Sequence, residues 1–430
     1  MKRIISLLSA TGSPLRRNFV RVARANVVAQ AAGLAASPVL SRIYSPADFG
    51  AFALFMSVAG LAVAVCTWRF DWSVPNTRHP ATAAALMVLG FLALAISSLV
   101  TLCGVVVIYL MAPEWFGRLG VLSVLIPLYL VGAGTILMFE GWYVRTNDLR
   151  LVSNARIAQS VTNIAMAVGA GLMKPGPFGL VVATVIAGWV GIGRLGLGAT
   201  DFWRERKRLT AMRLRAVFRR FRGEATRSSL VAVVNAASFS AIVIVLTANY
   251  ALHEVGWYTF MYRLAATPIA LVSASLGQSF WGTAADLARR RDIQALSALY
   301  QRTTRRLAWL TVPILIGCAA GPFVVGPLFG RDQWGAAGTV LLAMAPMLIG
   351  GALFSPTNHL FVLGRQSLQL VADMTRLILC VGAVFVCGRL GFDIVVAVAL
   401  CSFASLFGYW LRYLLHQRVH RQMIGAQVGE

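Results

Sequence analysis

Seven of the ionisable residues in or beside apolar stretches of this chain are candidates for function, and their types point to two kinds of chemistry. The arginines are Arg24, Arg69, Arg156 and Arg263, and the carboxylates are Asp71, Glu140 and Asp373. A guanidinium group binds phosphate or carboxylate through paired N–H donors. A carboxylate held away from water pairs with a cation or exchanges a proton. The sequence therefore predicts candidate anion-binding sites at the arginines and candidate ion-coupling sites at the carboxylates.

Arg263 is the clearest of these residues, because it lies inside the apolar stretch Val255–Phe280 with no acidic residue within a helical turn. Its guanidinium must meet an acid on another helix, a carbonyl, water or a phosphate of a ligand. A ligand contact and a structural ion pair are both open interpretations. Arg24 shares one helical face with Arg17 and Arg21, a spacing that predicts an interfacial helix. The alternative for Arg24 is that it faces a cavity.

The other charges have close neighbours in the sequence. Asp373 and Arg376 are three residues apart, so on one helix we expect them to face and neutralise each other. Arg69 and Asp71 are two residues apart, so we expect them to point to different faces and to serve different partners. Glu140 ends a predicted span, where it either pairs with a neighbouring helix or titrates as an ion-coupling acid.

Arg156 opens a polar stripe on another predicted helix. Gln159, Ser160 and Asn163 follow it at helical spacing. Such a stripe is typical of a face in contact with water, and it is equally typical of hydrogen bonding between membrane helices. Both interpretations stay open at this point.

Motifs for covalent catalysis or metal binding do not accompany these charges. The chain lacks the phosphate-loop, zinc-protease and nucleophile-elbow patterns. Its six cysteines lie in apolar stretches without the spacing of metal ligands, so we expect small packing residues there. The predicted outer connections are too short for a folded catalytic domain. We therefore expect no cofactor, no metal and no enzymatic activity.

Twelve apolar runs position these residues, each near the length of about 20 residues that a helix needs to cross a membrane. A composition of 58% hydrophobic and 13% charged residues excludes an ordinary soluble domain. The predicted spans are Asn26–Tyr44, Phe49–Trp68, Ala81–Leu110, Leu119–Phe139, Ile157–Met173, Phe178–Gly193, Ser228–Ala248, Val255–Phe280, Leu307–Phe329, Gly335–Val362, Leu368–Cys387 and Ile394–Leu411.

Basic residues sort to one side of this predicted membrane. With the amino terminus inside, 32 of the 39 Lys and Arg residues fall on the inner side, as the positive-inside rule requires. The sequence thus predicts a multi-pass protein of the plasma (cell inner) membrane with both termini in the cytoplasm. Topology and anionic lipid account for the net charge of +24, so we expect no nucleic-acid partner. Only the short apolar stretch Ile4–Ala10 follows Lys2 and Arg3, so we expect no cleavable signal peptide.

A long basic stretch, Arg194–Arg227, separates the spans into two sets of six. The predicted fold is an all-α integral membrane protein with two six-helix bundles. The predicted parts are a basic interfacial segment (1–25), an N-terminal bundle (26–198), a basic cytoplasmic linker (199–227), a C-terminal bundle (228–415) and a cytoplasmic tail (416–430).

The two halves repeat each other weakly. The spaced residues Leu40, Tyr44 and Gly50 recur after 206 positions as Leu246, Tyr250 and Gly256. Six spans separate the two copies, so both halves must have the same orientation in the membrane. That is the parallel repeat of many transporters, and alternating access by rocking of one bundle against the other follows as a hypothesis.

Three blocks of sequence carry a family resemblance. They are Leu40–Gly50 (LSRIYSPADFG), Trp68–Asp71 (WRFD), and a region through Tyr143–Arg145, Arg156–Ser160 and Gly179–Leu180. In these blocks the chain resembles bacterial polysaccharide-biosynthesis membrane proteins. These are the oligosaccharide flippases of the multidrug/oligosaccharidyl-lipid/polysaccharide exporter superfamily. The first block is the most specific of the three, and it identifies a family and not a substrate.

This resemblance implies a central cavity between the bundles and a polyprenyl-pyrophosphate-linked oligosaccharide as substrate. Such a repeat unit of O-antigen, capsule or exopolysaccharide would be flipped from the inner to the outer leaflet. The resemblance also implies cationic residues in the cavity, which favours Arg24, Arg69, Arg156 and Arg263 as substrate contacts. The implied partners are membrane lipids and the polysaccharide polymerase and chain-length machinery.

Two rival functions fit the same topology. A cation-coupled multidrug antiporter of the same superfamily would need a buried carboxylate, and the candidates are Glu140, Asp71 and Asp373. A membrane polysaccharide polymerase or ligase would need a sizeable outer loop with clustered acid, His or Arg residues. The outer connections of this chain hold little beyond Glu114 and the pairs His253-Glu254 and Arg331-Asp332.

Overall fold

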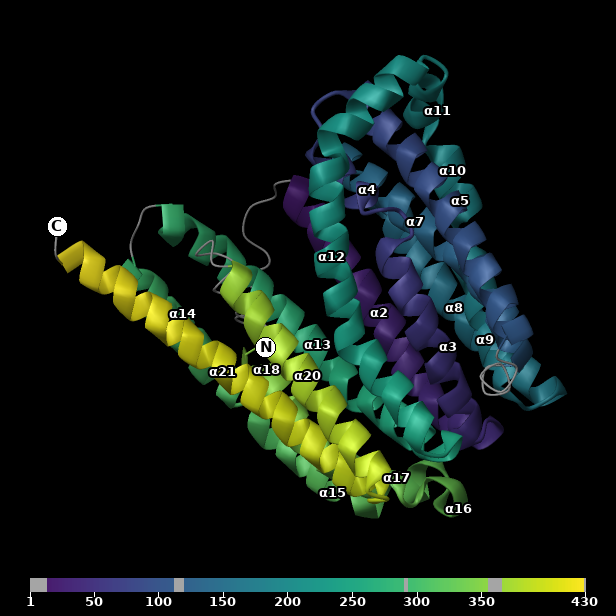
Figure 1. Ribbon diagram of the computed structural model, residues 1–430, viewed down its shortest axis with the longest axis vertical. Helices are drawn as coiled ribbons and strands as arrows, with labels where there is room; N and C mark the ends of the chain where they lie inside the picture. The colour runs from purple at the N-terminus through teal and green to yellow at the C-terminus, as the bar shows by residue number, and fades with distance from the viewer. Residues whose placement is uncertain (1–13, 112–119, 290–292, 355–365, 429–430) are drawn as a thin grey trace. The chain divides into compact units, whose positions relative to one another are not determined.

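The computed structural model describes residues 14–111, 120–289, 293–354 and 366–428, and every regular element in these ranges is a helix (Figure 1). This confirms the predicted all-α class. The first helices are α2 (Pro14–Ile43), α3 (Pro46–Val65), α4 (Phe70–Ser73), η1 (Val74–Asn76), α5 (Pro80–Met111), η2 (Gly120–Val124), α7 (Leu125–Thr146), α8 (Leu149–Met173), α9 (Pro177–Trp189), α10 (Ile192–Gly198), α11 (Thr200–Arg206) and α12 (Ala211–Asn249). The later ones are α13 (Leu252–Arg289), α14 (Ile293–Ala308), α15 (Thr311–Phe329), α16 (Arg331–Trp334), α17 (Ala337–Ala343), α18 (Ala345–Phe354), α20 (Gln366–Arg389) and α21 (Ile394–Val428).

These helices belong to two compact units. Unit 1 comprises Met1–Ile43 and Phe55–Ala236, and unit 2 comprises Tyr44–Leu54 and Ala237–Glu430. Two helices, α3 and α12, therefore contribute residues to both units. The predicted linker 199–227 is helical over α11 and the first part of α12, and Val217 and Ala225 of α12 are buried in the core of unit 1.

Many helices in the described ranges are apolar enough to cross a membrane. Eight segments qualify by length and composition, and the pair α17 and α18, bent by 45°, makes a ninth. The chain is thus a multi-pass membrane protein. Three other long helices carry candidate arginines, namely Arg24 on α2, Arg156 on α8 and Arg263 on α13. The count of twelve spans stays a prediction.

Prolines and capping residues explain where several helices begin. Helices α2, α3, α5 and α9 each start at a proline, whose fixed φ suits the first helical turn. Before α3, the backbone N–H of Ser45 donates to Oδ2 of Asp48 at 2.9 Å, and the N–H of Asp48 donates back to Oγ of Ser45 at 3.3 Å. Before α13, the N–H of Ala251 donates to Oε2 of Glu254 at 2.9 Å. The two caps are 206 residues apart, so the sequence repeat is also a structural one.

Unit 1 has an aromatic core at the ends of α5 and α7. Phe70, Trp142 and Phe202 are almost fully buried there, and the ring centroids of Trp142 and Phe202 are 5.7 Å apart. Helix α8 packs along both α2 and α9. This packing places the polar stripe of α8 between two helices of the same unit.

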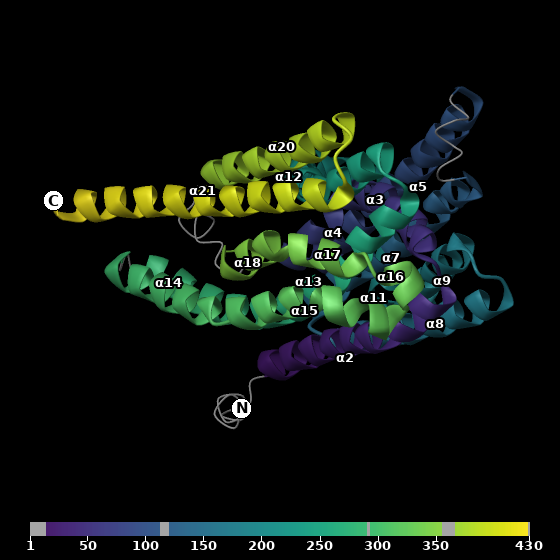
Figure 2. The same cartoon turned by 90° about the horizontal axis from the view of Figure 1, so that it is seen from below.

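Unit 2 is held by a long helix pair and an aromatic cluster. Helices α20 and α21 lie side by side in both Figure 1 and Figure 2. Near the start of α13, the ring of Phe260 lies 4.7 Å from Phe49 and 4.5 Å from Trp334 between centroids. Packing of such large rings stabilises this end of the unit.

Candidate functional site

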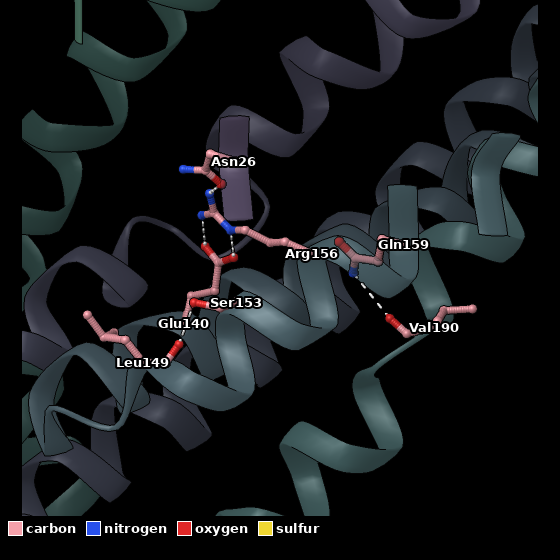
Figure 3. Close-up of polar contacts among 7 residues, drawn as sticks. All are labelled: Asn26, Glu140, Leu149, Ser153, Arg156, Gln159 and Val190. Atoms are coloured by element: carbon pink, nitrogen blue, oxygen red, sulfur yellow. Dashed lines mark hydrogen bonds and ion pairs between the residues drawn. The ribbon is translucent and has the colours of Figure 1, made fainter. Parts of the chain in front are cut away.

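The most complete polar site of unit 1 joins Glu140 of α7, Arg156 of α8 and Asn26 of α2. Nε and Nη2 of Arg156 donate to the two carboxylate oxygens of Glu140 at 2.9 and 3.0 Å. Nη1 of Arg156 donates to Oδ1 of Asn26 at 2.7 Å. Figure 3 shows the guanidinium of Arg156 directed at both partners. Two parallel bonds of this kind fix a carboxylate in direction as well as charge.

A tight turn between α7 and α8 brings this pair together. Asn147 ends α7 in the left-handed conformation at φ 57°, and its N–H donates to the carbonyls of Tyr143 and Val144. Asp148 then caps α8 by accepting a bond from the N–H of Arg150. Two antiparallel helices joined so closely place residues 140 and 156 at the same level.

The pair is partly open to its surroundings. The side chain of Arg156 is 36% exposed and that of Glu140 is 19% exposed. The carboxylate of Glu140 already has a cationic partner, so it would have to leave Arg156 before serving as a free base. Of the two alternatives for Glu140, the structure adopts the pairing with a neighbouring helix.

The polar stripe of α8 is used for bonding between helices. Nε2 of Gln159 donates to the carbonyl of Val190 at 3.2 Å (Figure 3). Oγ of Ser160 donates to the carbonyl of Ala29 at 3.0 Å, and Nδ2 of Asn163 donates to Oγ1 of Thr184 at 3.1 Å. These bonds satisfy polar groups that lipid would leave without partners.

Arg69 and Asp71 form an ion pair, contrary to the prediction that they serve different partners. Nη1 of Arg69 lies 3.9 Å from Oδ2 of Asp71. The prediction assumed a continuous helix, but α3 ends at Val65, and Trp68 and Arg69 take left-handed φ values of 48° and 55°. Asp71 is buried and also accepts a bond of 2.5 Å from Oγ1 of Thr67.

Asp373 and Arg376 do not form the predicted pair. Asp373 instead lies 3.9 Å from Nη1 of Arg412 on α21. The guanidinium of Arg376 lies over the ring of Tyr409, 4.9 Å from its centroid, and Nη1 is 3.4 Å from the Tyr409 hydroxyl. Helix α21 packs on α20 and offers each charge a separate partner, which the spacing within α20 could not reveal.

Arg263 differs from the other candidates. Its side chain is exposed, and its guanidinium has no hydrogen bond or ion pair with any residue that the structure describes. Thr259 and Thr267 stand one turn on either side of it, and the Thr267 hydroxyl donates to the Arg263 carbonyl. A cation that is exposed and has no partner in the described part of the chain suits an anionic ligand better than a structural ion pair.

The structure thus brings some predicted residues together and leaves others apart. Glu140 with Arg156, and Arg69 with Asp71, are pairs within unit 1, whereas Arg263 and Asp373 belong to unit 2. Arg24 is exposed on α2. The described residues contain no cluster of three or more His, Cys, Asp or Glu suited to a metal ion.

Sequence reasoning missed three contributors to these sites. Asn26 opens a predicted span, and its separation of 130 residues from Arg156 gives no sign in the sequence that the two side chains meet. Thr259 and Thr267 were overlooked, although their spacing of four residues from Arg263 places them on its helical face. A search for polar residues at i±4 from each charge inside a span would have found the threonines.

Comparison with known proteins identifies the family. The sequence model described as "Polysaccharide biosynthesis protein" matches residues 39–338, well over half of the chain. An inward-facing multidrug resistance MATE family transporter of the MOP superfamily is similar in structure, with a TM-score of 0.67 at 15% identity over 94% of this chain and 99% of that one. The lipid II flippase MurJ in an inward closed conformation has a TM-score of 0.67 at 10% identity, over 93% and 87%.

A sequence comparison with curated proteins finds no match. The similarity to the two solved structures extends over nearly the whole chain, and at these identities it shows that they share a fold. The family assignment is carried by the match to residues 39–338, which includes the blocks around Tyr44, Arg69 and Arg156. The chain belongs to the polysaccharide biosynthesis protein family.

Proposed function

We propose that this protein moves a polyprenyl-pyrophosphate-linked oligosaccharide across the plasma membrane, from the cytoplasmic to the outer leaflet. Membership of the polysaccharide biosynthesis family supports this function. The fold that the chain shares with a lipid II flippase supports it as well. No covalent step is involved, so the protein is a transporter and not an enzyme.

The exposed guanidinium of Arg263 is the observation that carries the proposal. A pyrophosphate with attached sugars cannot cross hydrocarbon unaided, because each unsatisfied polar group costs several kcal/mol there. An arginine within a long helix that has no partner among the described residues offers that head a fixed cation with paired N–H donors. Arg24 supplies further positive charge along the route, and Arg69 and Arg156 do so when they leave Asp71 and Glu140, while the prenyl chain stays in lipid.

Alternating access provides the movement in this proposal. The two halves rock about the predicted repeat axis, with domain boundaries at residues 26–198 and 228–415. Both termini lie in the cytoplasm, where basic residues collect. Glu140, Asp71 and Asp373 each contact an arginine, so each carboxylate would have to leave its arginine before it could serve a coupling ion. The polymerase and chain-length proteins act on the product.

Reconstituted flipping tests this function. Wild-type protein in vesicles should expose a fluorescent polyprenyl-pyrophosphate oligosaccharide to an impermeant quencher, and Arg263→Ala should abolish that exposure. Arg331→Ala is the matched control, because Arg331 is an exposed arginine of the short helix α16. A wild-type protein without flipping would refute the proposal, and a covalently altered substrate would favour a polymerase or ligase.

A cation-coupled multidrug antiporter is the second candidate. The fold shared with a MATE family transporter favours it. Cationic drug efflux that Glu140→Gln abolishes, together with absent lipid flipping, would establish this alternative. The close arginine partners of Glu140, Asp71 and Asp373 favour the flippase instead, because none of these carboxylates stands free.

A further inference from the structure

A groove on unit 1 lies between the turn after α3 and the first part of α12. Its volume is about 490 Å³, and its lining residues are Trp68, Phe218, Arg222, Gly223, Thr226 and Arg227. The set combines two guanidinium groups with two aromatic rings. The flipping route proposed above uses none of these six residues.

A strained turn presents Trp68 to this groove. Trp68 and the following Arg69 both take left-handed φ values, 48° and 55°, a conformation that costs bulky residues about 1–2 kcal/mol each. Successive strained residues of this kind persist where the surrounding structure holds them, and they are common at functional sites. The indole packs edge-on against Phe218 at 5.8 Å between centroids and stays 37% exposed. Trp68 thus contributes a partly exposed aromatic surface to the groove.

The groove carries the guanidinium groups of two arginines. Arg222 and Arg227 are exposed, and within the described parts of the chain neither guanidinium forms an ion pair or a hydrogen bond. Glu224 lies between them in the sequence but does not belong to the lining. Other arginines stand on the same stretch of α12, so the field around the groove is strongly positive. These are Arg213, Arg215, Arg219 and Arg220.

The position of the groove along α12 matches the boundary between water and lipid. From Ser228 to Asn249 the helix has no charged residue, and it belongs to one of the apolar segments able to cross a membrane. Leu230 and Val231, at the start of this run, are 64% and 58% exposed, as lipid-facing side chains are. Arg222 lies about 12 Å before Leu230 along the helix axis. Arginine and tryptophan at that depth stand at the level of lipid head groups.

We propose that this groove binds the head group of an anionic phospholipid. The phosphate lies between the guanidinium groups of Arg222 and Arg227. The indole of Trp68 lies beside the glycerol region. A guanidinium matches a phosphate better than an ammonium does, because its N–H donors form a planar fork. Basic pockets beside membrane helices on the cytoplasmic side recognise anionic lipid in the same way.

Lipid binding by defined variants tests the proposal on the full chain. The probe is phosphatidylglycerol, added to detergent-solubilised protein and counted by native mass spectrometry, with phosphatidylcholine as the neutral lipid. The double variant Arg222→Gln/Arg227→Gln should bind phosphatidylglycerol roughly tenfold more weakly, because it loses two charge-assisted contacts. The control Arg213→Gln/Arg215→Gln removes the same charge from exposed positions on the same helix. It should change binding less than about twofold, since screening leaves a distant charge with little effect.

Equal losses of phosphatidylglycerol affinity in the two double variants would overturn the proposal. Non-specific electrostatic attraction of the lipid to the basic part of α12 would then explain the binding. An unchanged affinity in the groove variant would also overturn it. A polyprenyl pyrophosphate that displaces phosphatidylglycerol at equal concentration would assign the groove to the substrate instead. Thermal melting of every variant verifies its fold, and Trp68→Phe, which keeps an aromatic ring, should lose less affinity than Trp68→Ala.

Discussion

Gly50 of α3 and Gly256 of α13 occupy equivalent places in a reciprocal helix contact. A Cβ added at Gly50 would overlap the carbonyl oxygen of Leu252, and one added at Gly256 would overlap the carbonyl oxygen of Pro46. Leu252 and Pro46 are themselves 206 residues apart, so each helix offers its first carbonyl to the glycine of the other. This is the two-fold contact expected of two copies with the same orientation.

Gly50→Ala should therefore destabilise unit 2. The added methyl group meets backbone and not a flexible side chain, and overpacking of this kind costs about 1–3 kcal/mol. The melting temperature of the purified protein in detergent is the measurement. Gly104→Ala on α5 is the matched control, because nothing lies within 4 Å of its added Cβ. That change should leave the melting temperature equal or slightly higher, since alanine favours a helix over glycine. Equal melting of both variants would disprove the close contact.

Asn147→Ala should destabilise unit 1 by about 1 kcal/mol, because alanine lacks the short polar side chain with which asparagine offsets the cost of the left-handed conformation at φ 57°. Asn147→Gly should be nearly neutral, since glycine adopts that conformation freely. Chemical or thermal unfolding of the two variants compares them directly. If glycine proved as harmful as alanine, the asparagine side chain and not its backbone would be the important feature.

The Glu140–Arg156 pair should show a measurable coupling energy. A double-mutant cycle with Glu140→Gln and Arg156→Met should give about 1–2 kcal/mol, between the values typical of exposed and of buried pairs. The exposed pair of Asp201 and Arg204, with side chains 67% and 68% exposed, provides the comparison. Its cycle should give at most about 0.5 kcal/mol. If the Glu140–Arg156 cycle also gave about 0.5 kcal/mol or less, that result would argue against the bidentate geometry.

Arg263→Ala should stop the display of surface polysaccharide in cells, and lipid-linked repeat units should collect in the inner leaflet. Arg263→Lys should retain partial function, because it keeps the charge but loses the fork of donors. Surface staining and extraction of lipid-linked sugars measure the two effects, at matched protein levels in the membrane. Normal display in Arg263→Ala would remove this residue from the set of substrate contacts.

The sequence predicted those features that depend on neighbouring residues or on a repeated pattern. The 206-residue offset predicted a repeat, and the structure shows equivalent caps at Asp48 and Glu254 in its two copies. The position of Arg263 amid apolar residues likewise marked it before any contact was known.

The sequence failed where a backbone break or a distant partner decided the contact. Arg69 meets Asp71 only because the chain leaves the helical conformation between Val65 and Phe70. Asp373 meets Arg412 across two packed helices, and no spacing within α20 records that neighbour. Helical periodicity assumes an unbroken helix and says nothing of the element packed against it, so both errors have the same origin.

The course of the chain between the two units has a mechanical consequence. Two of its three passages lie inside unbroken helices, after Leu54 in α3 and after Ala236 in α12. Helices bend gently unless a proline, a glycine pair or an inserted group interrupts their bonding. Any rotation of one unit must therefore twist or bend helices α3 and α12, because no flexible loop lies at these two passages.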